Sequence, residues 1–138
     1  MTREQIFLVQ RSWRQALPVA NAVAEMFYAK LFSLDPDVRA LFTNDMYEQR
    51  RKLMAIIGSV VSDLSRLERI LPAVQDLGRR HVGYGVQDAH YATVGTALLW
   101  ALEKGLGEAF TPDVKAAWAS AYRVLAKAMQ DAAAQVPA

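Results

Sequence analysis

The sequence contains no cysteine among its 138 residues. A chain without thiols forms no disulfide, no thiolate-bound zinc or iron–sulfur site and no cysteine nucleophile, and it suits a reducing compartment. Histidine is also scarce, since only His81 and His90 are present. Glycines separate the two, and their spacing is not that of a zinc-binding pair. Neither thiol chemistry nor a zinc site is therefore expected.

Long apolar runs and a signal-like start are missing as well. The longest uncharged stretch, 89–102, is interrupted by Tyr91 and Gly95 and is shorter than the roughly 20 apolar residues that a membrane span needs. The first five residues already include Glu4 and have no apolar core, so we expect no signal peptide. These features predict a cytoplasmic protein with no membrane span.

An excess of charge of one sign is lacking too. The 16 basic and 14 acidic residues give a formal net charge of +2. The basic runs 50–52 and 79–80 are too short to follow a phosphate backbone. We expect them on solvated helix faces and expect no nucleic-acid partner.

What is present indicates one globular domain over 1–138, because 53% of the residues are hydrophobic and 22% are charged. A chain of this length can bury a core or an enclosed ligand pocket without help from disulfides. The Ala-rich tail after about residue 132 is expected to fray. We expect a monomer or a weak homodimer.

Apolar residues recur with the period of a helix, and no stretch alternates as a half-buried strand would. The sequence therefore predicts an all-α fold of about six to eight helices. The signals that start or break helices are the capping pair Thr2 and Gln5, Pro18, Asp35-Pro36, the turn at 43–45, the glycines 83 and 85, Asp88, the glycines 105 and 107, and Thr111-Pro112. A short helix through Phe42 is expected after Asp35-Pro36.

His81 stands out because it continues the apolar face formed by Ile70, Val74 and Leu77. It is either a core histidine bonded to a carbonyl or the proximal ligand of a haem iron, with one ring nitrogen on the metal and the other donating to a backbone carbonyl. In the second case Leu77 and Val86 would wall the pocket. His90 is expected to be exposed.

A haem ligand also needs polar hydrogens on the other side of the pocket. Tyr28 offers a hydroxyl and Gln49 an amide, and Leu53 shares a helix face with Gln49. Phe42 can press on the flat ring. Taken singly, Tyr28 is equally well explained as a core tyrosine and Gln49 as a surface residue.

Over nearly the whole chain the sequence resembles the single-domain bacterial haemoglobins, which are akin to the globin domain of flavohaemoglobins. The residues that carry this resemblance, in order along the chain, are Phe27-Tyr28, Leu31-Phe32, Asp35-Pro36, Leu41-Phe42, Gln49 with Leu53, Leu71-Pro72-Ala73-Val74, Arg80-His81, His90-Tyr91, Val94-Gly95, Ala117-Trp118 and Ala121-Tyr122.

The resemblance implies a globin fold that holds haem b, iron protoporphyrin IX. By the same likeness His81 is the proximal iron ligand, Tyr28 and Gln49 are the distal hydrogen-bonding pair, Leu53 is a distal gate and Phe42 packs on the haem. Tyr91 would lie behind His81 and orient it, and Arg80 would pair with a propionate. The residues expected around the haem are Phe42, Leu53, Ile57, Leu77, Arg80, Val86, Tyr91, Val94 and Tyr122.

One position departs from the family pattern. Flavohaemoglobin-type members carry a glutamate on the last helix, where a gapless count from Tyr122 places Ala133 in this sequence. Without that carboxylate we expect less electron push from His81 toward the iron.

Three functions stay open at this point. The first is reversible binding of oxygen at a ferrous pentacoordinate iron, for storage, delivery or buffering, with nitric oxide and carbon monoxide as further ligands. The second is nitric oxide dioxygenation, which would need an external reductase because no flavin domain follows Ala138. The third is a haem-free globin-like signalling or interaction domain. The first is preferred, and whether the chain is an enzyme is left open.

Overall fold

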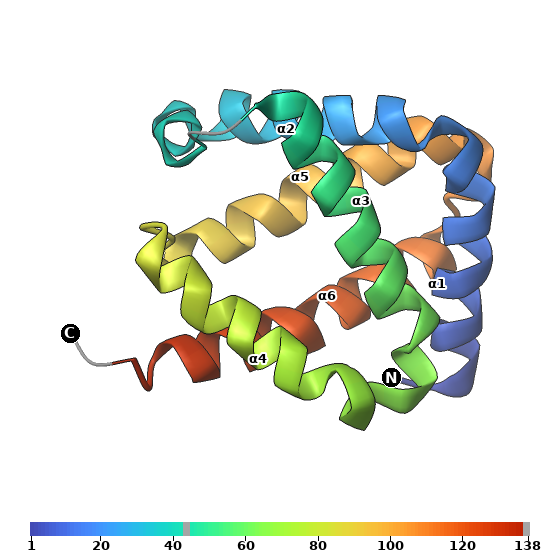
Figure 1. Cartoon of the computed structure of the whole chain (residues 1–138). Helices are drawn as coiled ribbons and strands as arrows, with labels where there is room; N and C mark the ends of the chain where they lie inside the picture. The colour runs from blue at the N-terminus through green and yellow to red at the C-terminus, as the bar shows by residue number, and fades with distance from the viewer. Residues whose placement is uncertain (43–44, 137–138) are drawn as a thin grey trace.

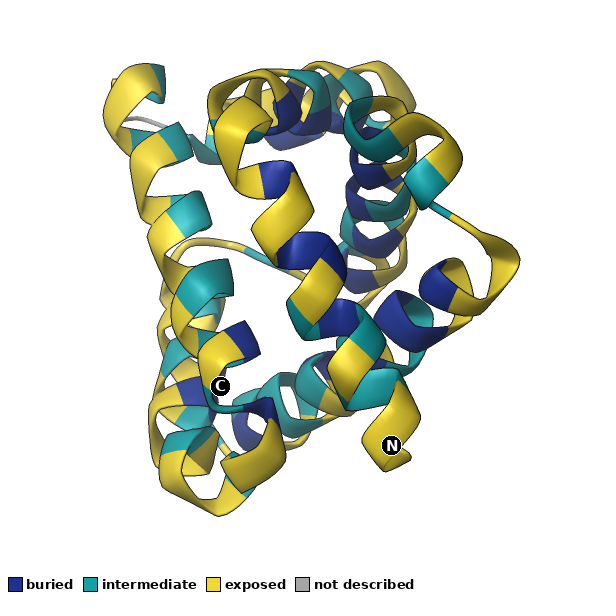
Figure 2. Ribbon diagram, turned by 90° about the vertical axis from the view of Figure 1, so that its right-hand side faces the viewer, coloured by how far each residue is buried: buried dark blue, intermediate teal, exposed yellow. Residues whose placement is uncertain are grey.

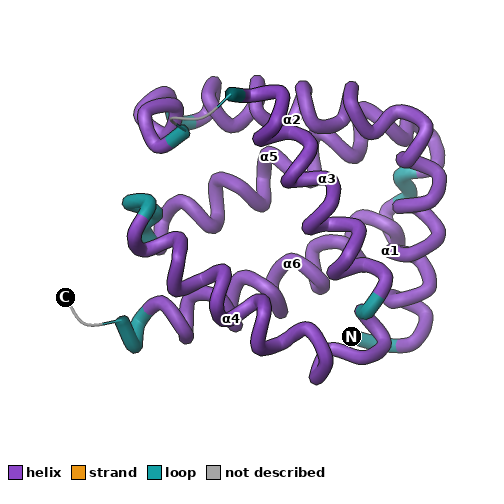
Figure 3. The backbone as a smooth tube through the Cα atoms, viewed as in Figure 1, coloured by secondary structure: helices purple, strands orange, loops and turns teal. Residues whose placement is uncertain are grey.

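The computed structural model describes residues 1–42 and 45–136, and within them it contains helices and loops but no strand (Figure 3). The six α-helices are α1 (Arg3–Ala16), α2 (Ala20–Leu34), α3 (Met46–Ser62), α4 (Leu67–Gly83), α5 (Asp88–Leu106) and α6 (Pro112–Ala133). The short 3-10 segments are η1 (Leu17–Val19), η2 (Pro36–Leu41), η3 (Leu64–Arg66) and η4 (Gly107–Ala109). The all-α prediction is confirmed.

Several helix ends follow the predicted local signals. The Thr2 side chain accepts the Gln5 N–H at 3.0 Å, and the Gln5 side chain accepts the Thr2 N–H in return. Thr111 caps α6 by accepting the Val114 N–H at 3.2 Å. Gly107 follows α5 with a positive φ of 58°, a conformation that favours glycine.

Three local predictions are corrected by the structure. Pro18 lies in η1 and not in the first turn of the second helix. Gln87, not Asp88, is the N-cap of α5, and Asp88 belongs to its first turn. Within the predicted turn at 43–45, residues 43 and 44 lie outside the described residues, while Asp45 caps α3 by accepting the Tyr47 N–H at 3.2 Å.

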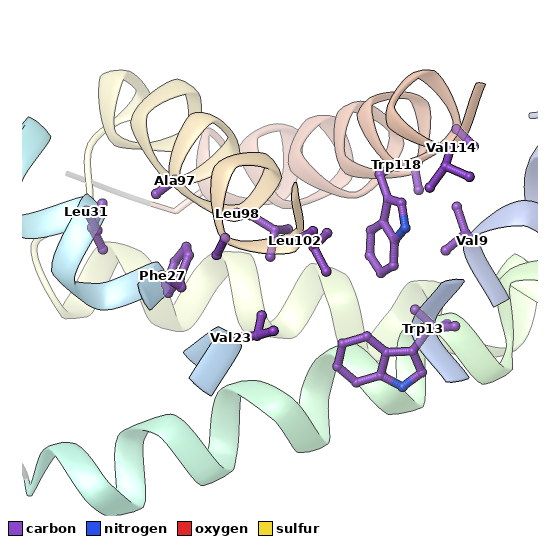
Figure 4. Packing of buried hydrophobic residues seen from close by; sticks show 14 of the residues in the cluster. Val9, Trp13, Val23, Phe27, Leu31, Ala97, Leu98, Leu102, Val114 and Trp118 are labelled. Carbon is purple, nitrogen blue, oxygen red and sulfur yellow. The ribbon is translucent and has the colours of Figure 1, made fainter. Parts of the chain in front are cut away.

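The core forms where α1 and α2 meet α5 and α6. Figure 4 shows the two indoles, Trp13 of α1 and Trp118 of α6, close together at a centroid distance of 6.2 Å. The Trp118 Nε1–H donates to the buried Ser12 hydroxyl at 2.8 Å, so the single buried polar side chain of this region is paired. Figure 2 shows the buried residues on the inner sides of the helices and the exposed ones outside.

The third and fourth helices are neighbours in the sequence but pack on different partners. Helix α4 lies along α6, while α3 packs on α2 and α1. Figure 1 shows the ribbons of α3 and α4 diverging from the corner where η3 joins them. Helix α6 is therefore the main packing partner of α4, whereas α3 packs mainly on α2 and α1.

Gly78 allows the close packing of α4 on α6. A Cβ built on it would lie 2.6 Å from the Met129 Cα, which is closer than atoms can approach. We predict that Gly78→Ala lowers the free energy of unfolding by about 3 kcal/mol, because overpacking outweighs the gain in helix propensity.

Gly83 is the matched control for this prediction, since it lies on the same helix and a Cβ there meets no atom within 4 Å. Gly83→Ala should leave the stability unchanged or raise it by up to about 1 kcal/mol. Urea unfolding followed by circular dichroism measures both variants. Equal midpoints for the two would show that α4 can move away from Met129 without cost.

Candidate functional site

His81 lies in the last turn of α4 with its ring half-buried. Its Nδ1 is 2.7 Å from the Leu77 carbonyl oxygen, to which the Nδ1–H donates. The neutral ring then carries its lone pair on Nε2, which bonds to no described residue. Burial lowers the pKa of His81, and the nearby Arg80 charge adds to this, although the bond to the Leu77 carbonyl opposes the shift. The side chain is thus a neutral imidazole with one free nitrogen, which is the form that binds a metal.

The structure brings Tyr28 of α2 and Gln49 of α3 together. The Gln49 Nε2–H donates to the Tyr28 hydroxyl oxygen at 3.2 Å. Since that oxygen accepts from Gln49, the Tyr28 hydroxyl hydrogen is free to be donated elsewhere. Burial raises the pKa of Tyr28, although the Gln49 bond and the Arg50 charge oppose the shift. Tyr28 is therefore a protonated donor at neutral pH.

An aromatic cluster surrounds the Tyr28 ring. Phe42 meets it edge-on at a centroid distance of 5.4 Å, and Phe32 lies 5.6 Å from Phe42. The Arg39 guanidinium covers Phe32 at 5.4 Å and donates to the Phe42 carbonyl at 3.1 Å. Sequence reasoning missed Phe32 as a site residue. The signal was present, because Phe32 follows Tyr28 by one helical turn on the same face.

The aliphatic residues predicted around the haem are neither buried nor fully exposed. This half-buried set comes from α3, α4, α5 and the turn before α5, and consists of Leu53, Ile57, Leu77, Val86 and Val94. Leu53 and Ile57 of α3 and Val94 of α5 pack against the core with part of their surface still accessible. Apolar side chains on inward faces normally lose this surface to a partner. A flat apolar group such as haem would provide one, so the residues present fit it.

Tyr91 and Tyr122 form a pair between α5 and α6. The Tyr122 hydroxyl donates to the Tyr91 carbonyl at 2.6 Å, and its ring fills the space beside Gly95, where a Cβ would come within 2.8 Å. Burial strongly raises the pKa of Tyr122. The Tyr91 hydroxyl is buried and has no hydrogen-bond partner among the described residues. The bond that orients His81 comes from Leu77, so the orienting role of Tyr91 remains a prediction.

Arg80 has a partner of its own. Its Nε lies 3.2 Å from the Asp76 carboxylate, one turn earlier on α4, and both side chains are more than half exposed. An exposed pair of this kind contributes little stability, so the guanidinium can exchange Asp76 for another anion. The pairing of Arg80 with a haem propionate therefore stays a prediction.

The prediction that His90 is exposed is wrong. Its side chain is 18% exposed, and its Nε2 lies 3.8 Å from the Asp35 carboxylate at the end of α2. Its Nδ1 accepts the Gln87 N–H at 2.9 Å. Sequence patterns missed this because the contact with Asp35 joins segments that are distant along the chain.

Two further features are absent from the described residues. Among these residues no cluster of three or more histidine, cysteine or acidic side chains could hold a metal ion, and no helix is long and apolar enough to cross a membrane.

The raised pKa of Tyr122 predicts how the unfolding free energy depends on pH. The folded pKa of Tyr122 is raised above its unfolded value, so the folded state holds this proton more tightly. Its contribution is fully present below about pH 10 and is lost as the pH rises further. We predict that the unfolding free energy of the haem-free chain falls between pH 10 and pH 11, with a smaller slope in Tyr122→Phe, as measured by urea unfolding. An identical slope in that variant would contradict this.

These features define a class of protein, an all-α domain with a polar site contributed by several helices. One helix provides a neutral histidine with a free nitrogen, two others provide a tyrosine–glutamine pair, and half-buried apolar side chains accompany them. The globin family model matches residues 25–129. The chain belongs to the globin family.

Individual relatives agree with this assignment. The flavohemoprotein of Bacillus subtilis is 32% identical over 111 residues, which cover 78% of this chain but 28% of that protein. The chain thus spans about a quarter of the length of this curated relative. A bacterial globin from Campylobacter jejuni is 27% identical with a TM-score of 0.84, covering 97% of each chain. An engineered carbene transferase, from a proposed nitric oxide dioxygenase of Rhodothermus marinus, is 25% identical with a TM-score of 0.89, covering 98% of this chain and 94% of that one.

Proposed function

We propose that this globin binds haem b and reversibly binds oxygen. When bound, haem would supply an iron that accepts a protein nitrogen ligand and binds a diatomic gas reversibly. The observation that carries the proposal is the Tyr28 hydroxyl, whose hydrogen is left free by the bond it accepts from Gln49. A bound oxygen molecule carries partial negative charge, and a donor held ready for it slows its escape.

The other side chains divide the remaining work. His81 offers Nε2 to the metal while the Leu77 carbonyl fixes the ring orientation. Phe42, Leu53 and Ile57, which are partly buried beside the core, would cover an apolar macrocycle and keep water away. Because the side chain next to Tyr28 is the Gln49 amide and not an imidazole, we expect no second histidine to compete with the ligand. Nitric oxide and carbon monoxide should bind at the same place.

Absorption spectroscopy tests the proposal directly. The purified protein should carry haem, and after reduction its spectrum should change on adding oxygen and return when the oxygen is removed, over repeated cycles. A protein that purifies without haem and takes up none when it is supplied would exclude this function. That result would favour the haem-free interaction domain, which the free His81 nitrogen and the half-buried apolar set argue against.

A second candidate function is nitric oxide dioxygenation to nitrate, favoured by the Rhodothermus marinus neighbour, which is described as a proposed nitric oxide dioxygenase. This reaction consumes an electron per turnover, so sustained activity requires a reductase that returns the iron to the ferrous state. The absence of a carboxylate at Ala133 favours holding oxygen over cleaving it. Oxygen binding is therefore placed first.

The two functions differ in the stoichiometry of nitrate formation. We expect the reduced, oxygen-saturated protein mixed with excess nitric oxide to form about one nitrate per chain and then stop. A nitrate assay with and without an added flavin reductase and NADH measures this. Rapid, sustained turnover with the reductase, at rates well above those of a reference oxygen carrier, would place the dioxygenase first.

A further inference from the structure

His90 connects the start of α5 with the end of α2, the helix that carries Tyr28. It lies in the first turn of α5, and Asp35 lies where α2 ends and η2 begins. Asp35 is fixed in place because its N–H donates to the Leu31 carbonyl at 3.0 Å and its carbonyl accepts the Val38 N–H at 3.1 Å. We call the contacts of His90 with Gln87 and Asp35 the His90 bridge.

The hydrogen bond from Gln87 fixes the orientation of the His90 ring. Because Nδ1 accepts the Gln87 N–H at 2.9 Å, it must carry a lone pair. The other ring nitrogen, Nε2, lies 3.8 Å from the Asp35 carboxylate, a polar contact that is longer than a hydrogen bond. Both side chains are more than half buried, so neighbouring groups limit how far either one can move away from the other.

The turn held by the bridge is tied to the backbone of His81. The Tyr84 and Val86 N–H groups both donate to the His81 carbonyl, at 3.1 Å and 3.0 Å. The same turn also touches η2, since a Cβ on Gly85, which has a positive φ of 87°, would lie 3.3 Å from Leu41 Cδ2. A shift of this turn relative to η2 would therefore move the end of α4 that carries His81.

We propose that His90 is a positioning residue that acts through this turn, holding His81 in register with the segment leading to Phe42 and so retaining haem. This inference rests on the proposed function, because it assumes that haem occupies the site. His90 has no direct role at the metal, since its two ring nitrogens are directed at Gln87 and Asp35. Its action on haem is indirect, as for residues that orient metal ligands from behind.

The first test measures the rate at which the haem-loaded protein loses haem to an excess of a haem-scavenging protein. We expect His90→Ala to lose haem about 10-fold to 100-fold faster than wild type. His90→Gln should restore most of the difference, because its amide oxygen can accept from Gln87 and its NH₂ can donate to Asp35. Asp35→Ala combined with His90→Ala should be no faster than His90→Ala alone.

Asp88→Ala is the matched control, since it alters the same first turn of α5 and its side chain has no hydrogen bond or ion pair with another described residue. It reports the general effect of changing this helix end, and we expect haem loss within about twofold of wild type. If His90→Ala and Asp88→Ala behave alike, or if the effects of Asp35→Ala and His90→Ala multiply, the positioning role is wrong.

A second test needs no haem and therefore separates this inference from the proposed function. In the haem-free protein, hydrogen exchange of the Tyr84 and Val86 amides reports the bonds to the His81 carbonyl. We expect about tenfold faster exchange in His90→Ala than in wild type, with rescue by His90→Gln. Unchanged exchange would overturn the bridge even if haem binds, and faster exchange in a protein that binds no haem would support the bridge while excluding the function.

Discussion

His81→Ala is expected to abolish stable haem binding. The Leu77 carbonyl accepts a hydrogen bond from Nδ1 of His81 and so holds the ring. The other nitrogen of this ring, Nε2, has no protein partner among the described residues. No other histidine can replace it, because the His90 nitrogens face Gln87 and Asp35. We expect haem loss to be on the order of a hundredfold faster or more, with a Soret band that is shifted or lost.

Added imidazole provides the control for this prediction. It should occupy the space left by the deleted ring and restore a wild-type-like spectrum in His81→Ala, and it should have little effect on wild type. His90→Gln, which changes the other histidine, should keep the wild-type Soret band. An unaltered spectrum in His81→Ala without imidazole would show that another residue ligates the iron.

The placement of His81 was predictable because it depends on local periodicity. Ile70, Val74 and Leu77 define an apolar face, and a helix that continues to Gly83 must bring His81 onto it. Helix caps at Thr2 and Thr111 were predictable for the same reason, since each cap involves residues three apart in the sequence.

Contacts between distant segments were not predictable from these patterns. The 3-10 segment around Pro18 depends on how α1 turns into α2, and the pairing of His90 with Asp35 depends on the packing of α2 against α5. Similarly, nothing in the sequence around Gly78 indicates that the Met129 backbone lies against it. The Tyr28–Gln49 bond is intermediate, because each residue was identified but their 3.2 Å contact required the crossing of α2 and α3.

Tyr28→Phe should speed the release of oxygen from the haem-loaded protein by about one to two orders of magnitude. A charge-assisted hydrogen bond contributes about 1.5–3 kcal/mol, and its loss is expressed mainly in the dissociation rate. The change removes one oxygen from a side chain that is 4% exposed and leaves the ring among Phe27, Phe32 and Phe42. Packing is therefore preserved, although the Gln49 amide loses its acceptor.

Stopped-flow measurement of oxygen dissociation tests this, with Tyr47→Phe as the matched control. Tyr47 is 57% exposed in the first turn of α3, so removing its hydroxyl should leave the rate of oxygen dissociation unchanged.

Gln49→Leu should speed oxygen release less than Tyr28→Phe does. In that variant Tyr28 keeps its own hydrogen to donate and loses only the amide that holds its oxygen. Carbon monoxide carries less negative charge than bound oxygen, so its release should change far less in Tyr28→Phe. An oxygen off-rate within about twofold of wild type, a difference of roughly 0.4 kcal/mol, would mean that the Tyr28 hydroxyl does not reach the ligand.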